Sequence, residues 1–332
     1  MKKRVLILLK LAVTVGALGW LLYKFEAANV FANLRTVAAP ALLLAGALVL
    51  AQSVLAAIRW HLLMRYLGIA IDLARTLQIF WIGQFATVLL PGGVAGDGVR
   101  MWVLTRDGTR ASASINSVIL DRVAALTGLF LLVAASLPFA DDRVAAASVR
   151  YALAAFLVAA VAVGLCIGLF LRPPERWLDY RVVRAVFALA EDLRAVCRSP
   201  RQALSLVALS IIGIGSNILT MFVLVRSLGV ALRFSDCMVL APLVVLITTL
   251  PVSLGGWGVR EGSTVGLFGL VGVPPAVSLS ASILIGLLTT LISVPGVVVW
   301  LRWSRIMAAG KNMANGDSGP AAGYVAVRGI EG

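Results

Sequence analysis

Two short motifs combine proline, glycine and charged residues in an otherwise apolar sequence. Residues 90–100 (LPGGVAGDGVR) and 250–260 (LPVSLGGWGVR) agree at six of eleven positions. Asp97 and Arg100 lie in the first motif, and Arg260 with its neighbour Glu261 closes the second. An arginine can hold phosphate or carboxylate through two parallel hydrogen bonds, and a helix N-terminus adds free backbone N–H donors. The motifs therefore predict a site for an anionic group.

We predict that six charged residues bind substrate. They are Asp97, Arg100, Asp121, Arg122, Arg260 and Glu261. A charge in the bilayer centre costs at least ~2.5–3.5 kcal/mol unless it is paired or hydrated. A purely structural ion-pair lock is the alternative. A separate hypothesis is that Asp97 or Glu261 neutralises the arginine of the opposite motif while the site is empty.

The pair Asp121-Arg122 needs a separate argument. Adjacent helix residues point about 100° apart, so at least one of the two is expected to face the bundle interior. Arg122 can equally extend toward the lipid head groups. Arg59-Trp60 is expected to end a membrane span as an interfacial anchor rather than to bind a ligand.

The proline and glycine residues predict that each motif reverses the chain inside the membrane. The expected turn residues are Pro91, Gly92, Gly93, Gly96 and Gly98 in the first motif and Pro251, Gly255, Gly256 and Gly258 in the second. The preceding apolar runs, Leu77–Leu90 and Met238–Leu250, are too short to cross a ~30 Å hydrocarbon core. Re-entrant helices are the interpretation, and a kinked structural turn in a larger bundle is the alternative.

The composition requires a membrane to surround these motifs. Hydrophobic residues make up 61% of the chain and charged residues 13%, whereas soluble domains carry roughly 25% charged residues. We predict an all-α integral membrane protein with about six full transmembrane helices and two re-entrant elements. The predicted spans are Val5–Tyr23, Ala38–Ile58, Ile115–Leu137, Val149–Leu171, Ala203–Val225 and Val277–Trp300.

The two motifs belong to a longer internal repeat. The sequences 67–70 (LGIA) and 228–231 (LGVA) match at nearly the same spacing as the motifs, which defines repeat units of about residues 38–138 and 203–300. Three predicted spans separate the first motif from the second, so the second enters from the opposite face. Inverted repeats with broken helices are typical of secondary transporters.

The distribution of Lys and Arg sets the predicted orientation. A cytoplasmic N-terminus places most of the 29 Lys and Arg residues inside, as the positive-inside bias requires. The net charge of +14 then reflects topology and not nucleic-acid binding. The basic loop 172–202 is expected either to lie on anionic lipid as an interfacial helix or only to set topology. Residues 1–310 form the predicted membrane domain of an inner-membrane protein, and residues 311–332 form a disordered cytoplasmic tail.

Few residues support hydrolytic or metal chemistry. His61 is the only histidine, which excludes a paired-histidine zinc site and histidine-activated nucleophiles. The three cysteines fall in unrelated segments and predict no disulfide framework. We therefore expect neither a metal nor a cofactor, and we do not expect an enzyme.

The motifs resemble those of the lysylphosphatidylglycerol synthase transmembrane-region family. The similarity rests on residues 83–100, on Leu120-Asp121-Arg122 with Gly128, and on residues 251–262. It implies a helical bundle with two re-entrant elements and the movement of a lipid between leaflets. Relatives that make aminoacylated lipid carry a soluble transferase domain, which is not expected after Lys311. A membrane-embedded lipid-modifying transferase with Asp97 or Glu261 as base, or another secondary transporter of an anionic solute, is the alternative.

Overall fold

The computed structural model describes residues 16, 19–21, 23–25, 27–90, 95–139, 180–248 and 256–314. Within these ranges all regular structure is helical. The elements are α2 (Ala27–Thr36), α3 (Ala39–Tyr66), α4 (Leu73–Leu89), α5 (Ala95–Arg106), α6 (Ala111–Ser136), a 3-10 turn η1 (Leu137–Phe139), α8 (Arg181–Cys197), α9 (Pro200–Ser227), α10 (Phe234–Thr248), α11 (Val259–Gly269), α12 (Pro275–Ser293) and α13 (Pro295–Ala314).

Four helices of the described part are long and apolar enough to cross a membrane. They are α3, α6, α9 and the continuous segment Pro275–Arg305 formed by α12 and α13. These correspond to four of the six predicted spans, so the all-helical, multi-pass membrane class is shown. The predicted span Val149–Leu171 lies outside the described residues, as does most of Val5–Tyr23. The helix α13 continues past residue 310, where the membrane domain was predicted to end.

The repeat is visible in how two long helices begin and end. A proline lies in the first turn of both α3 and α9, where its missing N–H costs no hydrogen bond. Each helix stops at a leucine followed by a glycine with positive φ, Gly68 at 73° and Gly229 at 84°. Only glycine adopts this conformation without strain. The LGIA and LGVA matches are therefore paired helix ends.

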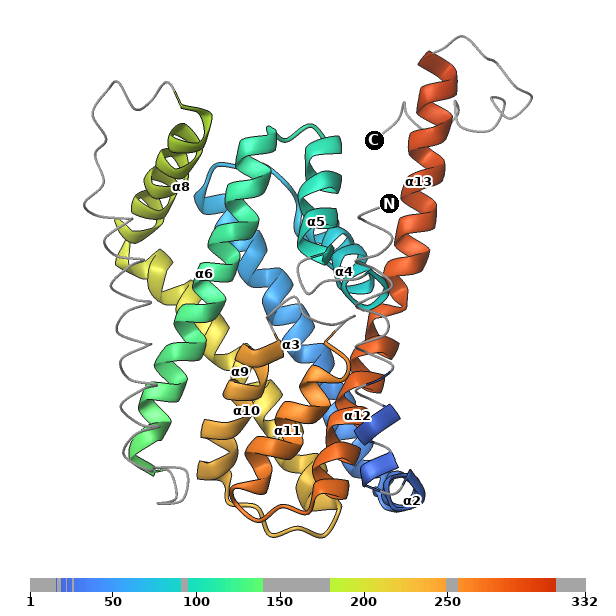
Figure 1. The fold of residues 1–332 in the computed structure, drawn as a ribbon. Coiled ribbons are helices and arrows are strands. Elements are labelled where there is room, and N and C mark those ends of the chain that lie inside the picture. The colour runs from blue at the N-terminus through green and yellow to red at the C-terminus, as the bar shows by residue number, and fades with distance from the viewer. Residues whose placement is uncertain are drawn as a thin grey trace.

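Two helical hairpins enter the bundle from opposite ends. The connections into α4 and out of α5 lie at the upper end in Figure 1, whereas those into α10 and out of α11 lie at the lower end. Both hairpins stop inside the bundle, beside the long helices α3 and α9. Residues 91–94 and 249–255 lie outside the described part, and with them Pro91, Gly92, Gly93, Pro251 and Gly255.

Close backbone packing holds the first hairpin together. A Cβ atom on Gly83 of α4 would lie 2.5 Å from Cγ of Arg100 and 3.0 Å from the carbonyl oxygen of Gly96 in α5. The indole of Trp81 donates a hydrogen bond of 2.9 Å to the carbonyl of Ile292, just before Pro295 interrupts the helix. The hairpin α4–α5 is thus fixed against the junction of α12 and α13.

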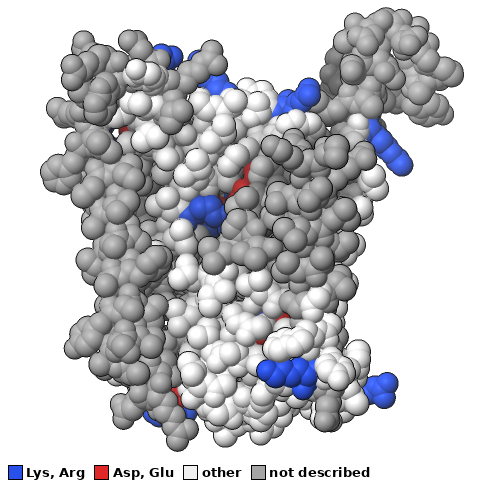
Figure 2. Space-filling model, viewed as in Figure 1, with Lys and Arg blue, Asp and Glu red and all other residues white. Residues whose placement is uncertain are grey.

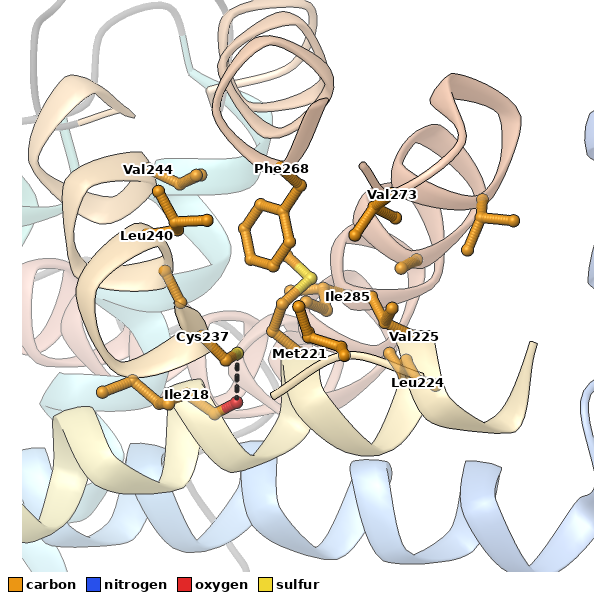
Figure 3. Close-up of a cluster of buried hydrophobic side chains, with 14 of the residues drawn as sticks. Ile218, Met221, Leu224, Val225, Cys237, Leu240, Val244, Phe268, Val273 and Ile285 are labelled. Atoms are coloured by element: carbon orange, nitrogen blue, oxygen red, sulfur yellow. Dashed lines mark hydrogen bonds between the residues drawn. The ribbon is translucent and has the colours of Figure 1, made fainter. Parts of the chain in front are cut away.

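An aliphatic and aromatic core holds the second hairpin. Phe268 of α11 is fully buried and lies among Met221 of α9 and Leu240 of α10 (Figure 3). The same cluster includes Ile285 of α12. This core contains no charged side chain, and its packing fixes α10–α11 to the lower half of the bundle.

The helix α8 of the basic loop packs against protein. Its apolar residues Leu189, Leu193 and Val196 contact a cluster that includes Leu63 of α3 and Leu206 of α9. A hydrogen bond of 2.6 Å from Asn116 of α6 to Asp192 adds a polar attachment. The helical spacing predicted at this loop is present, but this part of its apolar face covers the bundle and not lipid.

Candidate functional site: a buried ion network beside an amphipathic pocket

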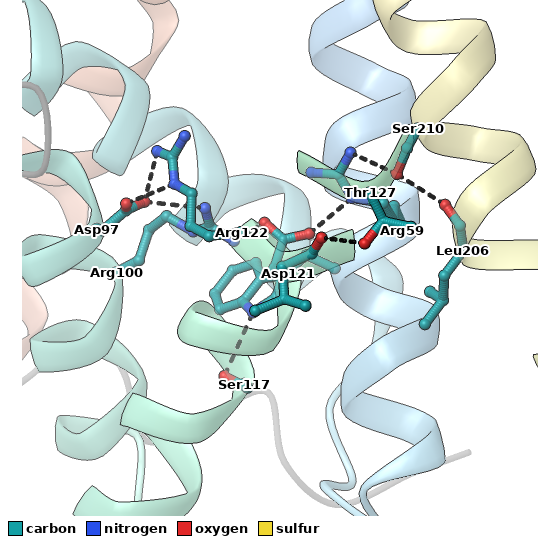
Figure 4. A network of polar contacts seen from close by, with 11 residues as sticks. Arg59, Asp97, Arg100, Ser117, Asp121, Arg122, Thr127, Leu206 and Ser210 are labelled. Atoms are coloured by element: carbon teal, nitrogen blue, oxygen red, sulfur yellow. Dashed lines mark hydrogen bonds and ion pairs between the residues drawn. The ribbon is translucent and has the colours of Figure 1, made fainter. Parts of the chain in front are cut away.

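Five charged side chains form one alternating chain of ion pairs. In order they are Arg59, Asp121, Arg100, Asp97 and Arg122, drawn from α3, α6 and α5. The outer pairs are short, 2.8 Å for Arg59–Asp121 and 2.7 Å for Arg122–Asp97. The central arginine is shared between the two acids at 3.2 and 3.3 Å. Figure 4 shows the three helices converging on the network.

The central Arg100 is the least satisfied member of the network. Its side chain is 5% exposed, and its Nε has no hydrogen-bond partner among the described residues. The guanidinium lies 4.0 Å from the ring centroid of Trp60 and 5.1 Å from that of Phe80. Such aromatic faces stabilise a desolvated cation by about 2 kcal/mol. The ring of Trp60 is itself held by a hydrogen bond to Ser117.

The prediction that Arg59-Trp60 ends a span as an interfacial anchor is wrong. The helix α3 continues to Tyr66, and both side chains are buried. Arg59 donates to Asp121 and, through Nη1, to Ser210 of α9 at 3.2 Å. The predicted span ended at Ile58 because a charge closed the apolar run, whereas the acid that neutralises this charge is 62 residues away in the sequence.

A pocket of about 290 Å³ opens beside the network. It lies between α3, α6, α9 and α10, and both end members of the ion chain, Arg59 and Arg122, line it. Gln52 and Ser210 add neutral polar groups. The remaining wall is apolar, formed by Ala56, Ala125, Leu126, Leu129, Leu209, Gly213, Ile214 and Val245. A cationic edge therefore faces an aliphatic wall.

Arg122 is the accessible part of this cationic edge. Its side chain is 48% exposed, whereas that of Asp97, to which it donates through Nε and Nη2, is 8% exposed. It is the twelfth residue of the 26-residue helix α6, about 16 Å from the start at 1.5 Å per residue. Figure 2 shows charged atoms at mid-height among uncharged surface, apart from those at the two ends. The charge thus lies near the middle of a spanning helix.

The α6–α9 crossing is close beside this pocket. A Cβ atom on Gly128 would lie 2.4 Å from Cβ of Ser210. A residue with a side chain at position 128 would separate the two helices. Gly128 therefore keeps Ser210 within reach of Arg59.

The second motif forms a smaller and more local site. Arg260 donates to the fully buried Glu261 through Nη2 at 2.6 Å and through Nε at 3.0 Å. The other carboxylate oxygen of Glu261 accepts the backbone N–H of Gly258 at 2.6 Å. An anion at this N-terminus was expected from the helix dipole, and Glu261 itself provides it. Ser282 of α12 also donates to this carboxylate.

The expected pairing of acids with the opposite motif's arginine is wrong for the described residues. Asp97 binds Arg100 and Arg122, and Glu261 binds its neighbour Arg260. Each hairpin enters from its own end of the bundle, which keeps the two acids with their own motifs. Arg260 and Glu261 do not line the pocket, so their role in substrate binding stays a prediction.

The predicted turn glycines divide into two groups. Gly256 and Gly258 have positive φ values of 82° and 84°, as a tight reversal before α11 requires. Gly96 and Gly98 instead lie inside the first turn of α5. Gly96 serves close packing, because a Cβ there would collide with the Gly83 carbonyl, whereas Gly98 has open space around it. The turn assignment for these two residues is wrong.

Sequence reasoning missed three pocket residues. Gln52, Arg59 and Ser210 are single polar residues in apolar helices. The helical spacing of Gln52 and Arg59, seven residues or two turns apart, puts them on one face of α3. That spacing was the available signal. Ser210 carried none, because its partner is 151 residues away.

The fold and this site together define a class of protein. The chain is a multi-pass helical membrane protein with two opposed hairpins and a buried network of charged residues beside an amphipathic pocket. Residues 7–296 match the model of the lysylphosphatidylglycerol synthase TM region. The chain belongs to this family, and its lipid-related membrane character follows from that membership. A search of curated proteins gave no match.

Proposed function

We propose that the protein moves a lipid with an anionic head group between the two leaflets of the inner membrane. The observation that carries the proposal is the pocket in which Arg59 and Arg122 face an aliphatic wall. A lipid needs both surfaces at once, because its phosphate must be neutralised while its glycerol and first methylenes stay in apolar contact. Arg122, half exposed and held by Asp97, makes the first contact with the phosphate.

The remaining charges hold the site in position. Asp97 and Asp121 fix the two end arginines, and Arg100 joins the acids from inside. Because Asp121 and Asp97 already hold the two guanidinium groups, these need little reorganisation when the head group arrives. Preorganisation of this kind reduces the cost of binding.

The hairpins α4–α5 and α10–α11 act in this proposal as inverted re-entrant elements. Each is too short to cross the bilayer, and each ends beside the long helices at membrane depth. The end that carries α8 and the α5–α6 connection is the cytoplasmic one in this proposal, because residues 180–202, the described part of the basic loop, lie there. The protein changes the position of the lipid and not its covalent structure.

Lipid redistribution in proteoliposomes tests the proposal. Purified protein is reconstituted with fluorescent phosphatidylglycerol, and a membrane-impermeant quencher reports the fraction in the outer leaflet over time. We expect faster exchange than in protein-free liposomes, slower exchange in Arg122→Gln, and an unchanged rate in Arg75→Gln, whose partner Asp107 lies at the bundle end. Exchange at the protein-free rate contradicts the proposal. Conversion of the labelled lipid to a new species favours the transferase instead.

A further inference from the structure

The charges around the pocket do not cancel. The ion chain contains three guanidinium groups and two carboxylates, so the network carries one excess positive charge. All four carboxylate oxygens of Asp97 and Asp121 already accept hydrogen bonds from arginine side chains. Among the described residues that line the pocket, none is acidic. No acid of the described pocket lining therefore neutralises the excess charge on the side that Arg59 and Arg122 form.

We infer that this pocket selects a head group with a single negative charge, a phosphodiester, over phosphomonoesters and zwitterions. The inference rests on the proposed lipid transport and adds the substrate class. One negative charge neutralises the network, whereas a doubly charged phosphomonoester leaves a negative excess in a low-dielectric site. An uncompensated charge there is costly in either sign.

The apolar wall argues against a zwitterion. The phosphate of a zwitterionic lipid can approach Arg122, but its ammonium must then lie near neutral residues such as Leu126, Leu129 and Val245. No acid lining the described pocket offers that ammonium a partner. A zwitterion therefore leaves the site with one excess positive charge, which now lies on an ammonium without an acidic partner among the described pocket residues.

The size of the pocket limits the head group as well. About 290 Å³ is at the lower end of the usual range for ligand pockets, about 300–1,000 Å³. The space suits a phosphate with a small neutral polar group that can reach Gln52 or Ser210, and it does not suit an oligosaccharide. The second motif does not alter this balance, because Arg260 and Glu261 cancel each other.

A variant that changes the charge without touching the network tests the inference. Gln52→Glu places one carboxylate in the pocket and keeps the oxygen that accepts from Asn217. The matched control is Gln78→Glu, the same change at an exposed position of α4 beside Arg75. Asp97→Asn changes the charge in the opposite direction. Thermal unfolding in detergent identifies the folded variants before transport is scored.

The assay compares three labelled lipids with identical acyl chains in the same vesicles. Phosphatidylglycerol is the monoanionic diester, phosphatidic acid the monoester, and phosphatidylcholine the zwitterion. We expect wild type to exchange phosphatidylglycerol at least about tenfold faster than the other two. Gln52→Glu is expected to lose most of this preference, Gln78→Glu to keep it, and Asp97→Asn to shift it toward phosphatidic acid.

The outcomes separate the two proposals. Wild type that moves none of the three lipids overturns the proposed function. Wild type that moves all three equally, or a preference for phosphatidylglycerol that Gln52→Glu leaves unchanged, overturns the charge selection while transport stands. A further arm adds soluble glycerophosphoglycerol as a competitor at the same concentration as the labelled lipid. Inhibition under this condition would show that the pocket binds a water-soluble phosphodiester, and it would overturn the assignment to a lipid.

Discussion

The two hairpins share a motif but use its arginine differently. Arg100 and Arg260 both lie over an aromatic ring, at 4.0 Å from Trp60 and 4.7 Å from Trp257. Both also occupy the space beside a glycine of a neighbouring helix, Gly83 for the first and Gly286 for the second. The geometry of the arginine's surroundings is thus repeated. What differs is the set of charges that each arginine meets.

In the second hairpin the charge of Arg260 is neutralised by a residue of the same helical turn. Glu261 neutralises Arg260 and accepts the backbone N–H of Gly258, and among the described residues only Ser282 adds a side-chain hydrogen bond from another helix. In the first hairpin the carboxylate of Asp97 points to Arg122 of α6, and Asp121 recruits Arg59 of α3. A duplicated motif therefore yields one neutral local pair and one extended cationic network with a pocket.

The comparison predicts the largest stability loss for Asp121→Asn. Asp121 neutralises both Arg59 and Arg100, and its removal leaves Arg59 without its acid and Arg100 sharing Asp97 with Arg122. We expect the free energy of unfolding to fall by about 3–5 kcal/mol, measured by denaturant unfolding in mixed micelles. Asp72→Asn, at an exposed helix end, is the control and should stay within about 0.5 kcal/mol of wild type. Equal free energies of unfolding for the two variants would show that the ion network does not stabilise the fold.

Glu261→Gln should cost less than Asp121→Asn. The amide oxygen can still accept the N–H of Gly258, and only one arginine, whose side chain is 15% exposed, loses its partner. We expect a loss of about 2–3 kcal/mol in the same unfolding assay. A loss larger than that of Asp121→Asn would show that the Arg260–Glu261 pair contributes more to stability than the network of the first hairpin.

Gly96→Ala should cost about 1–3 kcal/mol, because the new methyl group collides with the backbone of Gly83 and separates α4 from α5. Gly98→Ala in the same helix meets open space and should be neutral or stabilise by up to about 1 kcal/mol. Parallel melting curves of the two variants provide the measurement. A loss at position 98 that matches the loss at 96 would mean that the contact with Gly83 does not set the effect, because helix propensity favours alanine at both positions.

Part of this arrangement could be predicted from sequence. Apolar runs indicated α3, α6, α9 and α12, since a span of about 20 apolar residues has few other interpretations. The two motifs correctly indicated charged residues at hairpins, because proline ends a helix and glycine permits a tight reversal of the chain. Helix ends were less predictable, as the extension of α3 through Arg59 shows, because a charged residue ends a span only when nothing buries it.

The network itself depends on contacts between distant segments. Which acid neutralises which arginine is decided by helix packing, and the pair Arg59–Asp121 joins residues 62 apart. The close crossing of Gly128 and Ser210 decides whether α9 reaches the site. No local pattern carries this pairing, so Ser210 was absent from the predicted site. Gln52 and Arg59 were also absent, although their spacing of two helical turns was an available signal.

The central claim is that the first hairpin's network, and not the second hairpin's pair, holds the head group. Phosphatidylglycerol exchange in proteoliposomes of Arg122→Gln and Arg260→Gln tests it most directly, at equal reconstituted amounts of protein shown to be folded. We expect Arg122→Gln to lose at least about tenfold in rate, and folded Arg260→Gln to retain most of it. Wild-type exchange in Arg122→Gln together with lost exchange in Arg260→Gln would contradict the claim and place the head group at the second motif.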